Sequence, residues 1–148
     1  PAEMVRVTPF LLVLSLALVA QGLSDRKCVL TGQWKNDLGS NMTIGELQGN
    51  GAFSGTYLTA VSMSPKILES PLLGSQQHTN QPTFGFTVNW TFTDTTSVFT
   101  GQCFVDDEGK EVLKTMWLFR LHADSVQNNW NATLIGTNTF TRLHRQKQ

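Results

Sequence analysis

The sequence predicts an all-β protein, an eight-stranded antiparallel up-and-down barrel. Three observations lead to this prediction. Apolar and polar residues alternate with a period of two along most of the chain, Gly, Asn and Asp recur at short intervals between the alternating runs, and no stretch shows the apolar spacing of a helix. At 148 residues, with four Trp and nine Phe, the chain is long enough for one domain with an aromatic core.

The clearest alternation lies in residues 83–92, where Phe84, Phe86, Val88 and Trp90 share one face of a strand. Seven other runs show the same period more weakly. Short connections favour antiparallel pairing of consecutive strands, and eight such strands should close into a barrel wide enough for one small ligand. The expected strands cover residues 33–38, 41–47, 52–61, 67–74, 83–92, 96–105, 110–121 and 133–142.

The first 24 residues are expected to be separate from this domain. After the likely start at Met4 come a basic Arg6, an apolar run over 10–20, and small residues at Gly22 and Ser24. This pattern is typical of a secretory signal peptide. A membrane anchor is the alternative, but the run is shorter than the ~20 residues that a spanning helix needs. We therefore expect residues 1–24 to be extraneous residues plus a leader and residues 25–148 to form a secreted, extracellular domain.

The charge balance excludes two classes of partner. Eleven Lys and Arg residues oppose eleven Asp and Glu residues, so the formal net charge is zero. A nucleic-acid-binding domain should carry a clustered basic surface, and a protein held on an anionic membrane should carry a polybasic segment. We expect neither nucleic acid nor membrane as a partner.

The two cysteines, Cys28 and Cys103, both lie in the expected secreted domain. An oxidising compartment favours a disulfide between them. Metal binding is the weaker alternative, because a zinc site needs four ligands and His78, His122 and His144 are scattered along the sequence. We therefore expect no metal.

The face that would point into the barrel is too polar for a simple core. Asn36 shares a face with Trp34, Tyr57 with Thr59, and Asn138 lies among apolar residues. A buried polar group without a partner costs about 1–3 kcal/mol. Such groups either bond one another and ordered water, or they line a pocket that holds the polar ends of a ligand.

The opposite face of the last two strands carries apolar residues as well. Val112, Met116, Leu118 and Ile135 would point outward. Scattered surface apolar residues are common, but a group of them on a barrel indicates contact with another subunit. We expect the barrels to associate.

Several long blocks resemble the avidin family. They include Lys-Cys-Val-Leu-Thr-Gly-Gln-Trp at 27–34, Asn-Asp-Leu-Gly-Ser-Asn-Met-Thr-Ile at 36–44, Gly-Thr-Tyr at 55–57, residues 81–90, and the segments 99–104 and 109–118. The resemblance covers nearly all of residues 25–148. It implies a homotetramer of eight-stranded barrels that binds biotin as a ligand, without catalysis and without a cofactor.

The resemblance also implies roles for individual residues. Asn36, Ser40 and Tyr57 would donate to the ureido oxygen of biotin, Thr59 and Asn138 would accept its two N–H groups, and Ser97 would approach its sulfur. The remaining expected biotin contacts are the aromatic walls Trp90, Phe99 and Trp117, Trp130 from an adjacent subunit, and Leu38, Val61, Ser62, Met63, Ser64, Phe92, Thr93, Thr95 and Phe119. The Cys28–Cys103 pair matches the family's disulfide.

Three Asn-X-Thr sequons, at Asn41, Asn89 and Asn131, are glycosylation candidates in a secreted chain. Asn41 matches a sequon of the family. The chain departs from the family at Met63 and Phe119 in the pocket and at Thr137 on a subunit contact, which predicts a somewhat lower biotin affinity and a weaker interface.

Two other classes of function are considered. Gly-Gln-Trp at 32–34 resembles a signature of the lipocalins, which carry apolar ligands, but a lipocalin should have a helix after its barrel. An enzyme is less favoured still, because the acidic residues Asp94, Asp106, Asp107 and Glu108 fall in expected turns rather than on the inward face.

Overall fold

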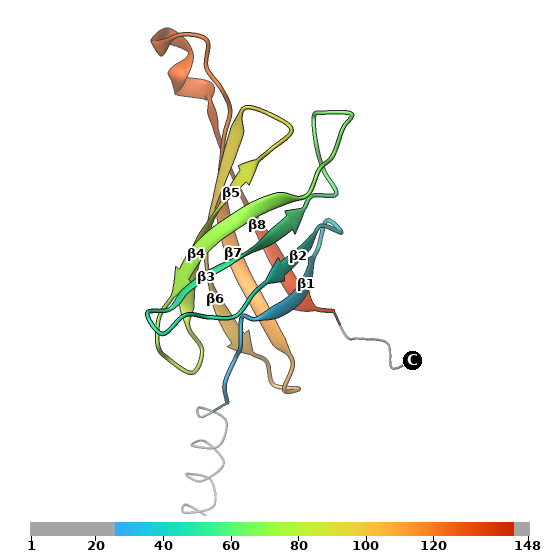
Figure 1. The fold of residues 1–148 in the computed structure, drawn as a ribbon, viewed down its shortest axis with the longest axis vertical. Coiled ribbons are helices and arrows are strands. Elements are labelled where there is room, and N and C mark those ends of the chain that lie inside the picture. The colour runs from blue at the N-terminus through green and yellow to red at the C-terminus, as the bar shows by residue number, and fades with distance from the viewer. Residues whose placement is uncertain (1–25, 144–148) are drawn as a thin grey trace, which may run out of the picture.

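The computed structural model describes residues 26–143 and shows a closed barrel of eight antiparallel strands (Figure 1). Each strand pairs with its neighbours in sequence, and β8 pairs back with β1. This confirms the predicted fold. The strands are β1 (Gly32–Asn36), β2 (Asn41–Ile44), β3 (Ala52–Leu58), β4 (Ser70–Gln76), β5 (Thr83–Trp90), β6 (Thr95–Val105), β7 (Glu111–Arg120) and β8 (Thr133–Arg142).

Two parts of the sequence analysis concern residues outside the described range. These are the expected leader at 1–24 and His144, so neither is described further. Within residues 26–143, no helix has the length and apolar character needed to cross a membrane.

The predicted strand ends were wrong at several places, because side chains bond the local backbone instead of leaving it to the sheet. β1 ends at Asn36, whose Oδ1 accepts hydrogen bonds from the backbone N–H of Leu38 and Ser40 at 3.0 and 2.9 Å. β3 ends at Leu58, and the Thr59 hydroxyl donates to the Val61 carbonyl at 2.7 Å. Such local bonds compete with strand pairing and favour turns.

The expectation of no helix was also wrong. A six-residue 3-10 helix, η1 (Val126–Asn131), lies between β7 and β8 and projects beyond the barrel wall (Figure 1). None of its residues is buried. A helix without a buried face has no apolar periodicity, which explains why the pattern did not reveal it.

Large apolar side chains fill the interior of the barrel. Trp34, Met42, Leu72, Leu113 and Phe140 are each at most 1% exposed. The indole N–H of Trp34 donates to the Leu30 carbonyl at 2.8 Å, so its one polar atom is satisfied. Trp34 is therefore held at the end of the barrel where the chain enters β1, which we call the closed end.

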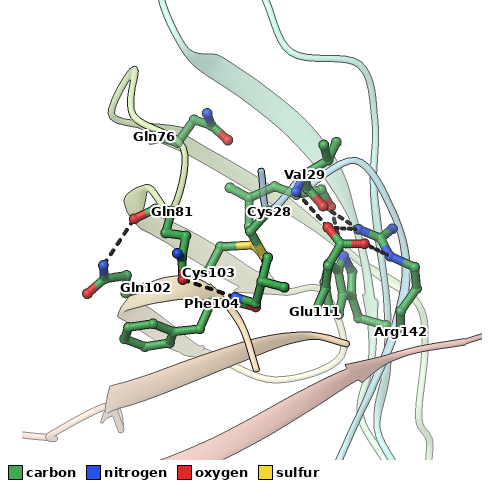
Figure 2. Close-up of a disulfide and its surroundings, with 12 residues drawn as sticks. Cys28, Val29, Gln76, Gln81, Gln102, Cys103, Phe104, Glu111 and Arg142 are labelled. Carbon is green, nitrogen blue, oxygen red and sulfur yellow. Dashed lines mark hydrogen bonds and ion pairs between the residues drawn. A yellow bond between two sulfur atoms is a disulfide. The ribbon is translucent and has the colours of Figure 1, made fainter. Parts of the chain in front are cut away.

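The Cys28–Cys103 disulfide is confirmed and ties the segment before β1 to β6 (Figure 2). The two residues are separated by 75 positions, and closing a loop of that length contributes about 4 kcal/mol in the chain-entropy model. Beside the disulfide, Arg142 on β8 forms an ion pair with Glu111 at 2.9 Å and lies over the Trp34 ring at 4.2 Å. Glu111 also accepts the backbone N–H of Val29 at 2.7 Å. These contacts hold the closed end together.

Exposed apolar side chains lie on the outside of β7 and β8, as predicted, and Val98 adds one on β6 that was not predicted. Val98 pairs with Leu118, and Leu118 pairs with Ile135, so the three form one row across three strands. Each is about half exposed or more in the single chain, and Met116 lies in the adjacent row with the same exposure as Leu118.

Candidate ligand-binding site

The upper half of the barrel encloses a cavity of about 270 Å³. Its lining comes from all strands except β2 and β4 and from the connections after β1, β3 and β5, which meet at the same end of the barrel as η1 (Figure 1). No lining residue is charged. The cavity is lined by Asn36, Leu38, Ser40, Tyr57, Thr59, Val61, Ser62, Met63, Trp90, Phe92, Thr93, Thr95, Ser97, Phe99, Trp117, Phe119, Leu134 and Asn138.

Three hydrogen-bond donors converge at the base of the cavity. Asn36 uses its Oδ1 to accept two backbone N–H groups, which leaves its amide nitrogen to donate, and one such bond reaches the Tyr57 hydroxyl at 3.1 Å. Tyr57 therefore accepts from Asn36 and retains its own proton. The Ser40 Oγ accepts the Ala60 N–H at 2.9 Å and likewise retains its proton. The base of the cavity is thus arranged to donate to an acceptor atom of a ligand.

Tyr57 is kept in its donating form. Burial raises the pKa of Tyr57 to about 12 from its ordinary value of 10, against hydrogen bonds with Ser40 and Asn36 that lower it; Asp37 nearby adds to the rise. The hydroxyl therefore stays protonated throughout the physiological pH range.

Two acceptors lie beside these donors. The Asn138 amide nitrogen donates to Asp37 Oδ1 at 2.8 Å, so its carbonyl oxygen is the atom left for a ligand. The Thr59 hydroxyl donates to the Val61 carbonyl, so its oxygen can act only as an acceptor toward a ligand. Three donors and two acceptors in one cavity are complementary to a ligand carbonyl group that has an N–H group on each side.

Aromatic rings form the walls above this polar base. The Trp90 indole N–H donates to Ser97 Oγ at 2.9 Å, which fixes the ring and leaves the serine proton free. Trp117 lies opposite Gly136 in the strand pairing. A Cβ at Gly136 would lie 2.1 Å from the Trp117 ring, so only glycine lets that indole take its position.

Of the nineteen residues predicted to contact biotin, the structure brings all but two together around one cavity. Ser64 lies outside the lining; its backbone N–H donates to Ser62 Oγ, and its own Oγ accepts the backbone N–H of Lys66. Trp130 lies on η1 and is 83% exposed, away from the cavity of its own chain.

Two residues with a place in the site were not among the predicted biotin contacts. Leu134 lines the cavity, and its position four residues before Asn138 on β8 puts it on the same inward face. Asp37 accepts a hydrogen bond from the Asn138 amide and so orients that side chain. The two residues are 101 positions apart, and no local sequence pattern predicts such a contact.

The Avidin family model matches residues 24–143, which is most of the chain. The chain is also 62% identical to avidin of Gallus gallus over 142 residues, which is 93% of each chain. This chain belongs to the avidin family. Membership confirms the resemblance read from the sequence and favours it over the lipocalin alternative.

Solved structures agree with this assignment. The crystal structure of Xenavidin has a TM-score of 0.78 and 53% identity, and the match covers 80% of this chain and all of that chain. An X-ray structure of a biotin binding protein from chicken has a TM-score of 0.77 and 55% identity with the same coverage.

Proposed function

We propose that this avidin-family protein binds biotin in the cavity at the open end of the barrel and performs no catalysis. Its similarity to avidin and to a chicken protein described as biotin binding supports biotin as the ligand. The observation that carries the proposal is that three donors and two acceptors line the same cavity.

The ureido group of biotin has the matching pattern. In our proposal its oxygen accepts from Asn36, Ser40 and Tyr57, while its two N–H groups donate to Thr59 and Asn138. Each of these five side chains already makes a hydrogen bond within the protein, so binding requires little further ordering of side chains. Preorganised groups of this kind favour tight binding.

The rest of the ligand would occupy the upper cavity. Trp90, Phe99 and Trp117 would enclose the bicyclic ring, and the Ser97 hydroxyl would approach the sulfur. Thr93, Thr95 and the 62–64 segment would meet the valerate chain and its carboxylate. Among the described residues the cavity has no charged lining and no acid–base pair, which accords with a binding protein rather than an enzyme.

We further propose a homotetramer in which Trp130 covers the cavity of an adjacent subunit. The exposure of Trp130 and the apolar row on the outside of β6, β7 and β8 support association. A tryptophan that is almost fully exposed in the single chain is an expected subunit contact.

The biological proposal is a secreted glycoprotein that sequesters or carries biotin, with nutrient withholding in egg as its role. The leader pattern at 1–24 and the disulfide support secretion. Asn41, Asn89 and Asn131 are all exposed, so each sequon is open to a glycan.

Native mass spectrometry with and without biotin tests the ligand and the assembly together. We expect four subunits and four bound biotin molecules. An Ile135→Glu variant should lower the subunit count, because it places a charge in the apolar row, while Thr79→Glu at the opposite end of the barrel serves as the control. A wild-type protein that takes up no biotin would contradict the proposal.

A further inference from the structure

The connection between β2 and β3 carries an Asn-Gly pair, Asn50-Gly51, which is the only such pair in the sequence. The chain reverses direction over residues 48–51, where the Gly51 N–H donates to the Gln48 carbonyl at 2.9 Å. This turn lies at the closed end of the barrel, away from η1, and none of its residues lines the cavity (Figure 1). Asn50 is exposed to solvent. A reaction at Asn50 can therefore proceed independently of ligand binding.

The fold requires glycine at position 51. Its φ is +85°, a left-handed conformation that other residues rarely adopt. A Cβ there would also lie 2.4 Å from the carbonyl oxygen of Gln76, at the end of β4. Asn50 is therefore followed by a residue without a side chain, and the Gly51 nitrogen is not shielded from the side chain of Asn50.

The Asn50 side chain is held beside that nitrogen. Its Oδ1 accepts the backbone N–H of Ala52 at 3.0 Å, which folds the side chain over the main chain in an Asx turn. The ring closed by this bond contains both Cγ of Asn50 and the nitrogen of Gly51, so the two atoms are brought together for reaction. The same bond draws electrons from Cγ and would stabilise the negative charge that develops on Oδ1 during an attack.

One hydrogen bond slows this reaction. The Gly51 N–H must leave the Gln48 carbonyl and lose its proton to hydroxide before the nitrogen can attack. Below the tip, the turn is anchored on both sides. The Gln48 N–H donates to the Ala52 carbonyl at 2.8 Å, and the Gln76 N–H donates to the Gly51 carbonyl at 3.0 Å. Residues 48–50 are exposed, so a local opening of the tip is sufficient and the barrel need not unfold.

We propose that Asn50 is a site of spontaneous deamidation, with water as the only co-reactant. The Gly51 nitrogen forms a bond to Cγ of Asn50, the bond from Cγ to the side-chain nitrogen breaks, and that nitrogen leaves as ammonia with the proton that Gly51 gives up. Water then opens the resulting succinimide ring at either of its carbonyl carbons. Opening at Cγ gives aspartate, and opening at the main-chain carbonyl gives isoaspartate, whose main chain contains an additional methylene. Either product is a carboxylic acid, which releases its proton to solvent.

The products differ from the original chain in charge and in the length of one turn. The formal charges of the chain balance, so each conversion leaves one uncompensated negative charge. The extra methylene of isoaspartate lies at an exposed tip, beyond the bonds that anchor the turn to β3 and β4. The protein therefore acquires an acidic form that accumulates with time while the barrel and its cavity are retained.

Peptide mapping of the full protein tests the site. The protein is incubated at pH 6 and at pH 9, and mass spectrometry with chromatographic separation of aspartate and isoaspartate peptides measures conversion at each asparagine. Asn128 is the matched internal control, because it is exposed as well but is followed by Asn129. We expect conversion at Asn50 to be at least about tenfold faster than at Asn128, and faster at pH 9 than at pH 6 because the attacking nitrogen must lose its proton.

Variants assign the acidic form to this turn. Asn50→Gln should abolish it, because the longer side chain would have to close a larger ring, and Asn128→Gln should leave it unchanged. Isoelectric focusing follows both variants. Asn50→Asp should focus with the acidic form from the start of the incubation.

The outcomes separate this proposal from that of biotin binding. Equal conversion at Asn50 and Asn128, or an acidic form that persists in Asn50→Gln, would overturn the deamidation site and leave the proposed function intact. Saturating biotin should not change the rate at Asn50, and protection by biotin would contradict the independence of this turn from the cavity. A protein that binds no biotin but converts at Asn50 would refute the proposed function alone.

Discussion

The two ends of this barrel are built from the same strands but serve different purposes. At the closed end, Trp34 and Phe140 fill the interior, and Arg142 and Glu111 hold the chain that enters β1. At the open end, polar side chains such as Asn36 and Tyr57 line a cavity. Each of them makes hydrogen bonds within the protein and keeps a donor or an acceptor for a ligand. The difference indicates that the closed end supplies stability and the open end supplies recognition.

The largest effect is expected at the closed end, with Trp34→Ala. The ring is fully buried and also contacts Arg142, so its removal leaves a cavity and should lower the free energy of unfolding by about 3–5 kcal/mol. Urea denaturation measures this change. Val126→Ala, at an exposed position on η1, is the control and should stay within about 0.5 kcal/mol. Similar losses in both variants would refute the view of the closed end as the stability centre.

The next effect is a pH dependence from Tyr57 at the base of the cavity. The phenol of the unfolded chain ionises near pH 10, whereas burial keeps the folded-state pKa near 12. Ionisation therefore favours the unfolded chain, and the free energy of unfolding should fall by about 2 kcal/mol as the pH rises from 10 to 12.

Urea denaturation at pH 9 to 12 measures this loss, with Tyr57→Phe as the matched control. The phenylalanine variant should lack this part of the pH dependence. Parallel curves for the two proteins would show that Tyr57 is not responsible.

A smaller effect on stability, with a specific effect on binding, is expected for Gly136→Ala. The added methyl group would meet the Trp117 ring, and such overpacking costs about 1–3 kcal/mol. The displaced indole should lower biotin affinity about tenfold or more, as measured by competition. Gly49→Ala is the control, because a Cβ there has open space, and it should change neither property. Unchanged affinity in Gly136→Ala would remove Trp117 from the site.

The smallest effect is expected at the rim of the open end, where His122 Nδ1 lies 2.8 Å from Asp94. Both side chains are mostly exposed, and pairs of this kind contribute less than about 1 kcal/mol. Asp94→Asn should therefore leave the unfolding midpoint in urea nearly unchanged. A loss comparable to that of Trp34→Ala would show that the rim also carries stability.

Alternation in the sequence was sufficient to predict the barrel and to place most of the site residues. A two-residue period assigns each strand position to one face, so Trp90 on β5 and Ser97 on β6 could be expected inside before any contact was known. The avidin resemblance then supplied which inward residues belong to one cavity.

Other features depend on contacts that alternation does not encode. The Thr59 hydroxyl ends β3 through a local backbone bond, and η1 has no buried face to create a pattern. The bond from Asn138 to Asp37 joins residues that are distant in sequence.

The central claim is that the donors at the base of the cavity recognise the ureido group of biotin. Calorimetric titration of biotin into the wild type and into an Asn36→Ala/Ser40→Ala/Tyr57→Phe variant, whose folding is checked by circular dichroism, tests it most directly. We expect saturable binding of one biotin per subunit in the wild type and at least a roughly hundredfold weaker affinity in the variant, since each of the three lost donors costs about 1–3 kcal/mol. No binding in the wild type, or equal affinity in a folded variant, would contradict the account.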